Sequence, residues 1–379
     1  MGGELERRNR LSAVTEVMTP RQRWLAAVRL QPVDRLPFWP KLDRAYPRAQ
    51  APPFRHMEFD AIHDWIGSDK HVGIGRCTRE VRTRTARQVS ERDGCRIERL
   101  RVPGGTLERV HRFDVDSQSW HPVAFPVKRP EDIPLMIEWF EDCQVELDPD
   151  ALDRARRRVR EIGEDAVTTT SIGVSALMDW VQHLAGIEAA HLLLRDCPDE
   201  VLALFDAQHR VLRRTAELLA DRWPGDLIYS IENTSTTLIS PDQYRRYSYP
   251  HIQEYGEIIS GAGRLFVLHM CGHLKALLPT LSTLPVHAFE AFTAPTLGNT
   301  TLLDGRSACP NVCLIGGTQA THWTRPAADI IAFIRTSLDE LPHHRGLVVT
   351  SAGVMPPLCK PETIRDVCEW VKSYPARVE

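Results

Sequence analysis

The sequence lacks the features that mark several classes of protein. No run of apolar residues approaches the roughly 18 that a membrane-spanning helix needs. Charge of one sign is not in excess, because 47 Lys and Arg against 50 Asp and Glu give a net charge of −3. A near-neutral chain offers no electrostatic footprint for a nucleic acid. We therefore expect neither a membrane nor a nucleic acid among the partners of this protein.

Signals for secretion are also missing. The first residues, MGGELERRNRLSAVTEV, are largely charged or polar and contain no apolar segment of a signal peptide. The chain has nine cysteines, an odd number that fits reduced thiols better than a disulfide framework. We predict a cytoplasmic protein in which residues 1–17 form a flexible tail.

The common catalytic motifs are absent as well. The sequence contains no GxGxxG turn after an apolar strand, no Walker A loop, no GxSxG elbow and no HExxH helix. Dinucleotide binding, nucleotide hydrolysis and the standard hydrolase arrangements therefore receive no support. Any chemistry must come from residues that the fold brings together.

What the sequence does contain is a repeated strand and helix pattern. Apolar residues make up 42% and charged residues 26% of the chain, which is typical of a globular protein with a large core. Eight short apolar segments, most of them rich in β-branched residues, alternate with helical patterns: 35–39, 71–75, 167–173, 226–233, 264–272, 287–292, 311–317 and 346–353. This rhythm predicts a (β/α)₈ TIM barrel, with a doubly wound parallel sheet as the alternative. We expect a single barrel domain over residues 18–379.

Two segments depart from that rhythm. Thr19-Pro20 has the N-cap hydroxyl and first-turn proline of a helix start, so a helical segment should precede the first strand. Residues 76–113 alternate charged and apolar side chains around turns at Asp93-Gly94 and 103–105. This pattern predicts a β-hairpin or meander inserted into the barrel, with one solvated face.

The ends of the predicted strands carry the candidate site. In a TIM barrel the active site lies at the carboxyl ends of the strands, and the fifth predicted strand ends in His269-Met270-Cys271. Residues i and i+2 of a strand share a face, so the imidazole and the thiol should converge. An imidazole and a thiolate are both zinc ligands. The carboxylate of Glu232, at the neighbouring strand end, and the thiol of Cys359, after the last strand, are the candidates for a further ligand.

Several ordered motifs resemble the uroporphyrinogen decarboxylase superfamily. They are residues 18–23 (MTPRQR), 34–37 (DRLP), 237–244 (TLISPDQY), 269–272 (HMCG) and 360–365 (KPETIR). The similarity runs from about residue 18 to 375, nearly the whole chain. The resemblance implies a (β/α)₈ barrel.

The same resemblance separates two branches of the superfamily. Residues 39–46, WPKLDRAY, lack the paired arginines with which the tetrapyrrole decarboxylases bind carboxylates. The HxCG segment is similar to that of the methylcobalamin:coenzyme M methyltransferases and of corrinoid-dependent demethylases. That likeness implies zinc on His269, Cys271 and a cysteine after the last strand. The matching segment here, residues 351–354, ends in Val354, so Cys359 or Glu232 would have to complete the site.

The resemblance therefore implies a zinc-dependent methyltransferase. It would move a methyl group between a small methylated substrate, or a thiol or folate acceptor, and a corrinoid (cobalamin) carrier. Methylcobalamin or another corrinoid would come from a partner protein or act free in solution, and Glu232 and Glu290 would orient groups or transfer protons. The alternatives are a decarboxylase of a small carboxylic acid and a non-catalytic barrel that binds a corrinoid or porphyrin. The methyl donor, the acceptor, the direction of transfer and the oligomeric state are not predicted.

Overall fold

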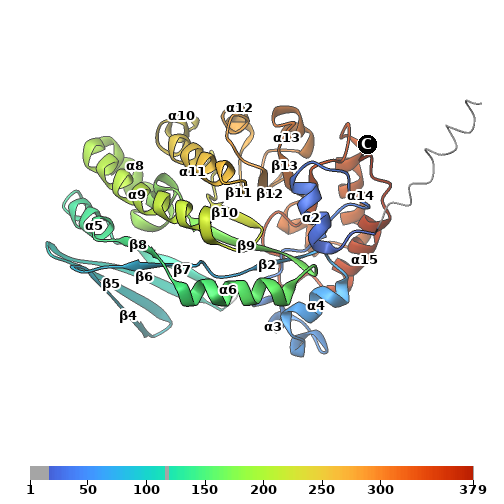
Figure 1. The fold of residues 1–379 in the computed structure, drawn as a ribbon, viewed down its shortest axis with the longest axis horizontal. Coiled ribbons are helices and arrows are strands. Elements are labelled where there is room, and N and C mark those ends of the chain that lie inside the picture. The colour runs from blue at the N-terminus through green and yellow to red at the C-terminus, as the bar shows by residue number, and fades with distance from the viewer. Residues whose placement is uncertain (1–16, 116–118, 379) are drawn as a thin grey trace, which may run out of the picture.

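Eight parallel strands form the centre of the molecule. The computed structural model describes residues 17–115 and 119–378. The strands are β1 (Phe38–Trp39), β2 (Lys70–Gly73), β9 (Ala166–Gly173), β10 (Leu227–Ile231), β11 (Leu265–His269), β12 (Ala288–Phe292), β13 (Cys313–Gly317) and β14 (Leu347–Thr350). Their order is β1-β14-β13-β12-β11-β10-β9-β2, and every neighbouring pair is parallel. Figure 1 shows these strands surrounded by helices.

The two ends of this sheet, β1 and β2, meet through Asp69, the residue before β2. Its backbone N–H donates to the carbonyl of Phe38 at 2.8 Å, and its carboxylate accepts from the N–H of Phe38 at 3.0 Å. The strands thus make a nearly closed ring. The predicted (β/α)₈ TIM barrel is confirmed, and each of the eight predicted segments overlaps one of these strands.

Helix α2 (Pro20–Val28) covers the amino end of the barrel. Thr19 caps it with a capping box, as the Thr-Pro sequence predicts. Trp24 of this helix belongs to the buried cluster formed by the inward-facing side chains of the strands. Because α2 fills the amino end, the opposite end, where the strands finish, is where a ligand can enter.

Side chains alternate between the inside and the outside of the barrel along each strand. In β11, Leu265 and Val267 belong to the inner cluster, whereas Phe266 and Leu268 pack with the outer cluster beneath the helices. His269 follows the inward series and therefore points into the barrel at its carboxyl end.

The remaining helices and turns surround the barrel. The α-helices are α3 (Tyr46–Ala49), α4 (Phe59–Ile66), α6 (Pro149–Ile162), α7 (Ala176–Asp179), α8 (Ile187–Asp196), α9 (Pro198–Arg222), α10 (Pro241–Gln243), α11 (Tyr249–Gly261), α12 (Leu278–Leu281), α13 (Leu302–Ala308), α14 (Ala327–Asp339) and α15 (Pro361–Ser373). Shorter helical turns are η1 (Phe54–His56), η2 (Trp180–Leu184), η3 (Tyr244–Ser248), η4 (Lys275–Leu277) and η5 (Ala320–Thr324). No helix in the described part of the chain is both long and apolar enough to cross a membrane.

An antiparallel insertion lies where residues 76–113 predict a hairpin or meander. It is a four-stranded sheet of β4 (Ala86–Arg92), β5 (Cys95–Val102), β6 (Gly105–Asp114) and β7 (Ser119–Ala124). The insertion also extends further than predicted, because α5 (Asp132–Glu141) packs on β5 and β6, and β8 (Gln144–Leu147) pairs with β3 (Thr78–Val81). This pairing of segments over 60 residues apart is not visible in a local pattern.

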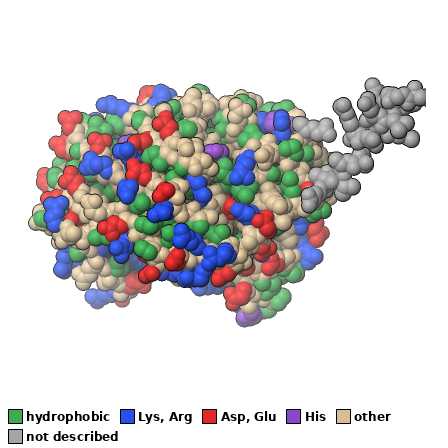
Figure 2. Space-filling model, viewed as in Figure 1, with side chains coloured by type: hydrophobic (Ala, Val, Ile, Leu, Met, Phe, Trp, Pro, Cys, Tyr) green, Lys and Arg blue, Asp and Glu red, His purple; other side chains and the backbone are tan. Residues whose placement is uncertain are grey.

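The surface over α6 is basic, and the predicted amino-terminal tail can be compared with the structure. Lys and Arg side chains gather over α6 in the lower middle of the molecule, and Arg154, Arg156, Arg157, Arg158 and Arg160 are all exposed (Figure 2). They form the solvated face of that helix. The predicted tail, residues 1–17, lies outside the described residues except for Val17.

Candidate active site at the mouth of the barrel

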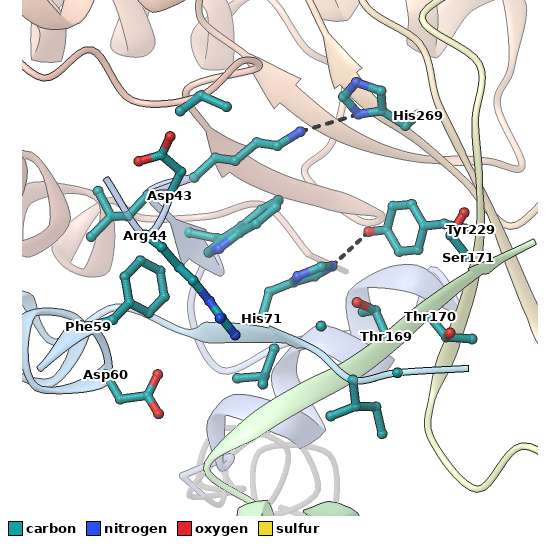
Figure 3. A pocket seen from close by; sticks show the side chains of 18 of the residues that line it. Asp43, Arg44, Phe59, Asp60, His71, Thr169, Thr170, Ser171, Tyr229 and His269 are labelled. Carbon is teal, nitrogen blue, oxygen red and sulfur yellow. Dashed lines mark hydrogen bonds between the residues drawn. The ribbon is translucent and has the colours of Figure 1, made fainter. Parts of the chain in front are cut away.

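A cavity of about 1250 Å³ lies at the carboxyl end of the barrel. Its lining comes from β1, β2, β9, β10, β11 and β12 and from the segments that follow β1 and β2 (Figure 3). Hydroxyl groups of Thr169, Ser171 and Tyr229 line one side, and the side chains of His269 and Glu290 line another. The cavity therefore combines polar groups with residues that can carry charge.

Lys41, His269 and Glu290 form a charged cluster in this cavity. His269 and Glu290 are paired in register on β11 and β12, and the Nδ1 atom of His269 contacts the Glu290 carboxylate. Lys41, which follows β1, reaches across the barrel. Its Nζ lies 2.9 Å from Oε1 of Glu290 and 3.3 Å from Nδ1 of His269, the upper dashed contact in Figure 3. One buried carboxylate thus faces two basic groups.

The cluster shifts the pKa values of its own members. Burial lowers the pKa of His269, but the Glu290 carboxylate and the neighbouring Cys271 outweigh this effect and raise it to about 9. Burial raises the pKa of Glu290, but His269 and Lys41 more than offset it and hold that pKa well below its usual range. At neutral pH Glu290 is therefore ionised and His269 is protonated, so the cluster carries a surplus positive charge.

Cys271 lies beside this cluster, as its predicted spacing from His269 requires. Strand β11 ends at His269, so Cys271 sits in the following loop and is half-buried. Its Sγ lies 3.4 Å from Oδ1 of Asn233. The next residue, Gly272, has φ +114°, a conformation that side chains disfavour, and a Cβ there would meet Ser235 at 2.7 Å. Gly272 therefore allows the loop to pass close to Ser235.

Glu232, predicted as a catalytic group and ligand, lies in a different environment. Its carboxylate is fully buried and accepts hydrogen bonds from the N–H of Ser175 at 2.9 Å and from the hydroxyls of Ser175 and Ser230. Leu227 and Tyr229 face the inside of the barrel, so strand alternation turns Ser230 and Glu232 outward. Burial raises the pKa of Glu232, although the serine hydrogen bonds act in the opposite direction. The backbone N–H of Glu232 donates to the carbonyl oxygen of His269 at 2.9 Å, but its carboxylate is held by Ser175 and Ser230 and not by the imidazole of His269.

Cys359, the other candidate ligand, is also placed elsewhere. It lies just before α15, is 1% exposed and packs in the outer hydrophobic core. Burial raises the pKa of its thiol to about 12, so the thiol is neutral at ordinary pH. The position at which the resemblance implies a cysteine is Val354, which is 49% exposed and lines the cavity.

The side chains present do not fit a firmly held zinc ion. Catalytic zinc sites use three protein ligands. Among residues 17–115 and 119–378, no group of three His, Cys, Asp or Glu side chains is arranged to hold a metal ion. His269 and Cys271 lie side by side, but Glu232 and Cys359 are buried elsewhere, and Glu290 is paired with Lys41. Zinc binding stays a prediction, and no reaction step below depends on it.

His71 and Lys41 also line the cavity, and neither was predicted from the sequence as a site residue. His71 of β2 stacks on Trp39 with ring centroids 4.3 Å apart, and its Nε2 lies 3.0 Å from the hydroxyl of Tyr229 (Figure 3). Burial lowers the pKa of His71 to about 4, so this imidazole is neutral. The alternation of strand side chains could have pointed to Lys41, two residues after the inward-facing Trp39.

A protein-family model matches the part of the chain that forms most of the barrel. The model described as uroporphyrinogen decarboxylase (URO-D) matches residues 155–374, more than half of the chain. The chain belongs to the uroporphyrinogen decarboxylase family. The matched range contains β10 to β14, and hence His269, Cys271 and Glu290.

One solved structure with the same fold is a methyltransferase. A methyltransferase from Methanosarcina mazei superposes with a TM-score of 0.58 at 14% identity, over 94% of this chain and 99% of that chain. A proposed vitamin-B12 independent methionine synthase from Listeria monocytogenes is more distant, with a TM-score of 0.37 at 12% identity over 89% of this chain and 94% of that one. No curated protein matches the chain. At these identities the likeness extends to the fold.

Proposed function

We propose that this protein is an enzyme that transfers a methyl group between a corrinoid carrier and a small thiol or other anionic substrate. The observation that carries the proposal is the Lys41–Glu290–His269 cluster beside Cys271 at the mouth of the barrel. The HMCG segment at the end of β11 and the fold shared with a methyltransferase over nearly the full chain support it.

The charge of the cluster suits an anionic acceptor. A protonated His269 and Lys41 against one carboxylate leave one surplus positive charge beside the cavity. A nearby positive charge lowers the pKa of a thiol, and the thiolate is the nucleophilic form. Lys41 and His269 would therefore hold a substrate thiolate at the barrel mouth.

The residues of this chain bind and orient the reactants. The corrinoid, supplied by a partner protein or free, provides the methyl group or accepts it. In the direction of thiol methylation, the sulfur–carbon bond forms as the cobalt–carbon bond breaks, and the bonding electrons stay on cobalt. The neutral His71 positions the hydroxyl of Tyr229 toward the same cavity, where it can hydrogen-bond the substrate.

The same cluster favours one second candidate, a decarboxylase of a small carboxylic acid. Lys41 can pair with a substrate carboxylate, and the protonated His269 can return a proton to carbon after CO₂ leaves. Decarboxylation would need no proton donor other than the side chains that line the cavity.

The test is a paired assay of the full chain. Purified protein is incubated with methylcobalamin and a set of small thiols, and the cobalamin spectrum is followed with time. In parallel, small carboxylic acids are tested for CO₂ release. Thiol-dependent demethylation that falls at least tenfold in Lys41→Met supports methyl transfer, with Lys275→Met as the control for loss of an exposed lysine. CO₂ release without methyl transfer would favour the decarboxylase, and corrinoid binding without turnover would leave a binding protein.

A further inference from the structure

Lys41 contacts both Glu290 and His269 at the mouth of the barrel. Its Nζ lies within 3.3 Å of a polar atom on each of them, and its side chain is 20% exposed, facing the cavity. Glu290 is only 2% exposed. Among the described residues, its basic ion-pair partners are Lys41 and His269. The ammonium group therefore supplies the positive charge that this buried carboxylate needs.

A divalent metal would have to compete for the same atoms. Zinc binds nitrogen and oxygen donors through their lone pairs at about 2.0–2.2 Å. One carboxylate oxygen of Glu290 contacts Lys41 and the other contacts Nδ1 of His269, so each oxygen already has a basic partner. A zinc ion drawing on Glu290 would stand a few ångströms from the lysine ammonium, so the two cations would repel each other inside a poorly solvated site.

The number of side chains that could bind zinc also argues against a bound metal ion. The cavity position of Val354 offers a hydrocarbon side chain, and the thiol of Cys359 is buried in the outer core. Cys271 lies against Asn233. With Lys41 in place, His269 and Cys271 are the two donors left, fewer than the three that hold a catalytic zinc ion.

We propose that Lys41 is the resident cation of this site: its ammonium group pairs with Glu290 beside His269 and keeps a divalent metal out. This inference rests on the proposed function, because it assigns to Lys41 and His269 the charge stabilisation of an anionic substrate. Lys41 acts as a specificity-determining residue that decides which cation serves the site.

Zinc binding tests the proposal directly. Metal-depleted full chain is titrated with zinc against a chromophoric chelator, for wild type, Lys41→Met, Lys41→Arg and Lys41→Met combined with Val354→Cys. We expect the wild type and Lys41→Arg to bind zinc weakly, Lys41→Met at least tenfold more tightly, and the double variant more tightly still. Adding His269→Gln to Lys41→Met should remove the gain.

Two results would overturn the proposal. One is near-stoichiometric zinc in wild-type protein that survives dialysis, and the other is a Lys41→Met variant, shown to be folded by circular dichroism, whose zinc affinity matches that of the wild type. If Lys41→Met does not fold, Val354→Cys in the wild-type background replaces it: a tightly bound zinc in that variant would show that Lys41 does not keep metal out.

The outcome separates this inference from the proposed function. Methyl transfer by metal-depleted wild type agrees with both. Methyl transfer that requires added zinc retains the function and overturns the role of Lys41. The expected zinc affinities without any methyl transfer retain the role of Lys41 and overturn the function.

Discussion

His269 carries a positive charge at neutral pH because of the side chains that surround it. The Glu290 carboxylate faces its Nδ1, and the resulting pKa of about 9 lies above the value near 6.5 of an unfolded histidine. A raised pKa in the folded state stabilises the fold fully below the unfolded pKa, and the stabilisation is lost as the pH rises through the folded one.

A His269→Gln variant tests this charge. The free energy of unfolding of wild type should exceed that of the variant by on the order of 3 kcal/mol near pH 6, and the difference should shrink as the pH rises from about 6.5 to 9. Urea denaturation of both proteins at several pH values measures it, with Glu290 still paired to Lys41 in each. A difference that stays constant over this range would contradict the assigned charge.

Glu232 should behave as a structural residue. Its buried carboxylate accepts from the N–H and hydroxyl of Ser175, and an amide in Glu232→Gln would present a donor to those donors. We expect a loss of about 1–3 kcal/mol in the free energy of unfolding, with kcat and KM per folded molecule unchanged. Denaturation and steady-state kinetics together check this. A large fall in kcat with stability intact would return Glu232 to the active site.

Strand alternation explains which site residues the sequence could identify. His269 and Glu290 lie on the inward series of β11 and β12, where strand ends and register place them together. Glu232 lies at a strand end but on the outward series of β10, so its position in the sequence does not place its carboxylate in the cavity. The burial of Cys359 depends on how the segment before α15 packs, which no local pattern contains.

At the scale of elements, the strands of the barrel were predictable because each is a short apolar run between turn and helix signals. The insertion was predictable only in its first part. Its strands β4 to β6 lie in the segment where charged and apolar residues alternate. Strand β8 (QVEL) also alternates polar and apolar residues, but nothing in its four residues identifies the distant β3 as its partner. Long-range pairing is set by the packing of the whole insertion.

The insertion is buried at its central strand β5 and exposed at its edge strand β4, and two substitutions on the same face of the sheet compare these positions. Leu100 of β5 is 3% exposed, whereas Val89 of β4 is 48% exposed. Leu100→Ala should lower the free energy of unfolding by about 2–4 kcal/mol, because it removes buried methyl groups and leaves a cavity. Val89→Ala should change it by less than about 0.5 kcal/mol. Equal effects in denaturation experiments would show that the sheet does not pack as described.

At the scale of the whole molecule, Asp69 holds the barrel closed. It is fully buried, pairs with Arg23 and Arg35, and bridges β1 to β2 through Phe38. Asp69→Asn removes the carboxylate charge from the buried Arg23, which keeps only Asp34, and from the partly buried Arg35, and should cost about 3–5 kcal/mol in the free energy of unfolding. Glu164→Gln, which weakens the largely exposed pair with Arg21, should cost less than about 1 kcal/mol. Denaturation midpoints of the two variants compare them, and similar losses would contradict a special role for Asp69.

The central claim is that the charged cluster at the barrel mouth supports methyl transfer to an anionic substrate. The most direct measurement is the rate at which metal-depleted full chain demethylates methylcobalamin in the presence of small thiols, compared between wild type and Lys41→Met. The account predicts a thiol-dependent rate in wild type that falls at least tenfold in the variant. A wild-type rate no higher than that without protein, with or without added zinc, would contradict it.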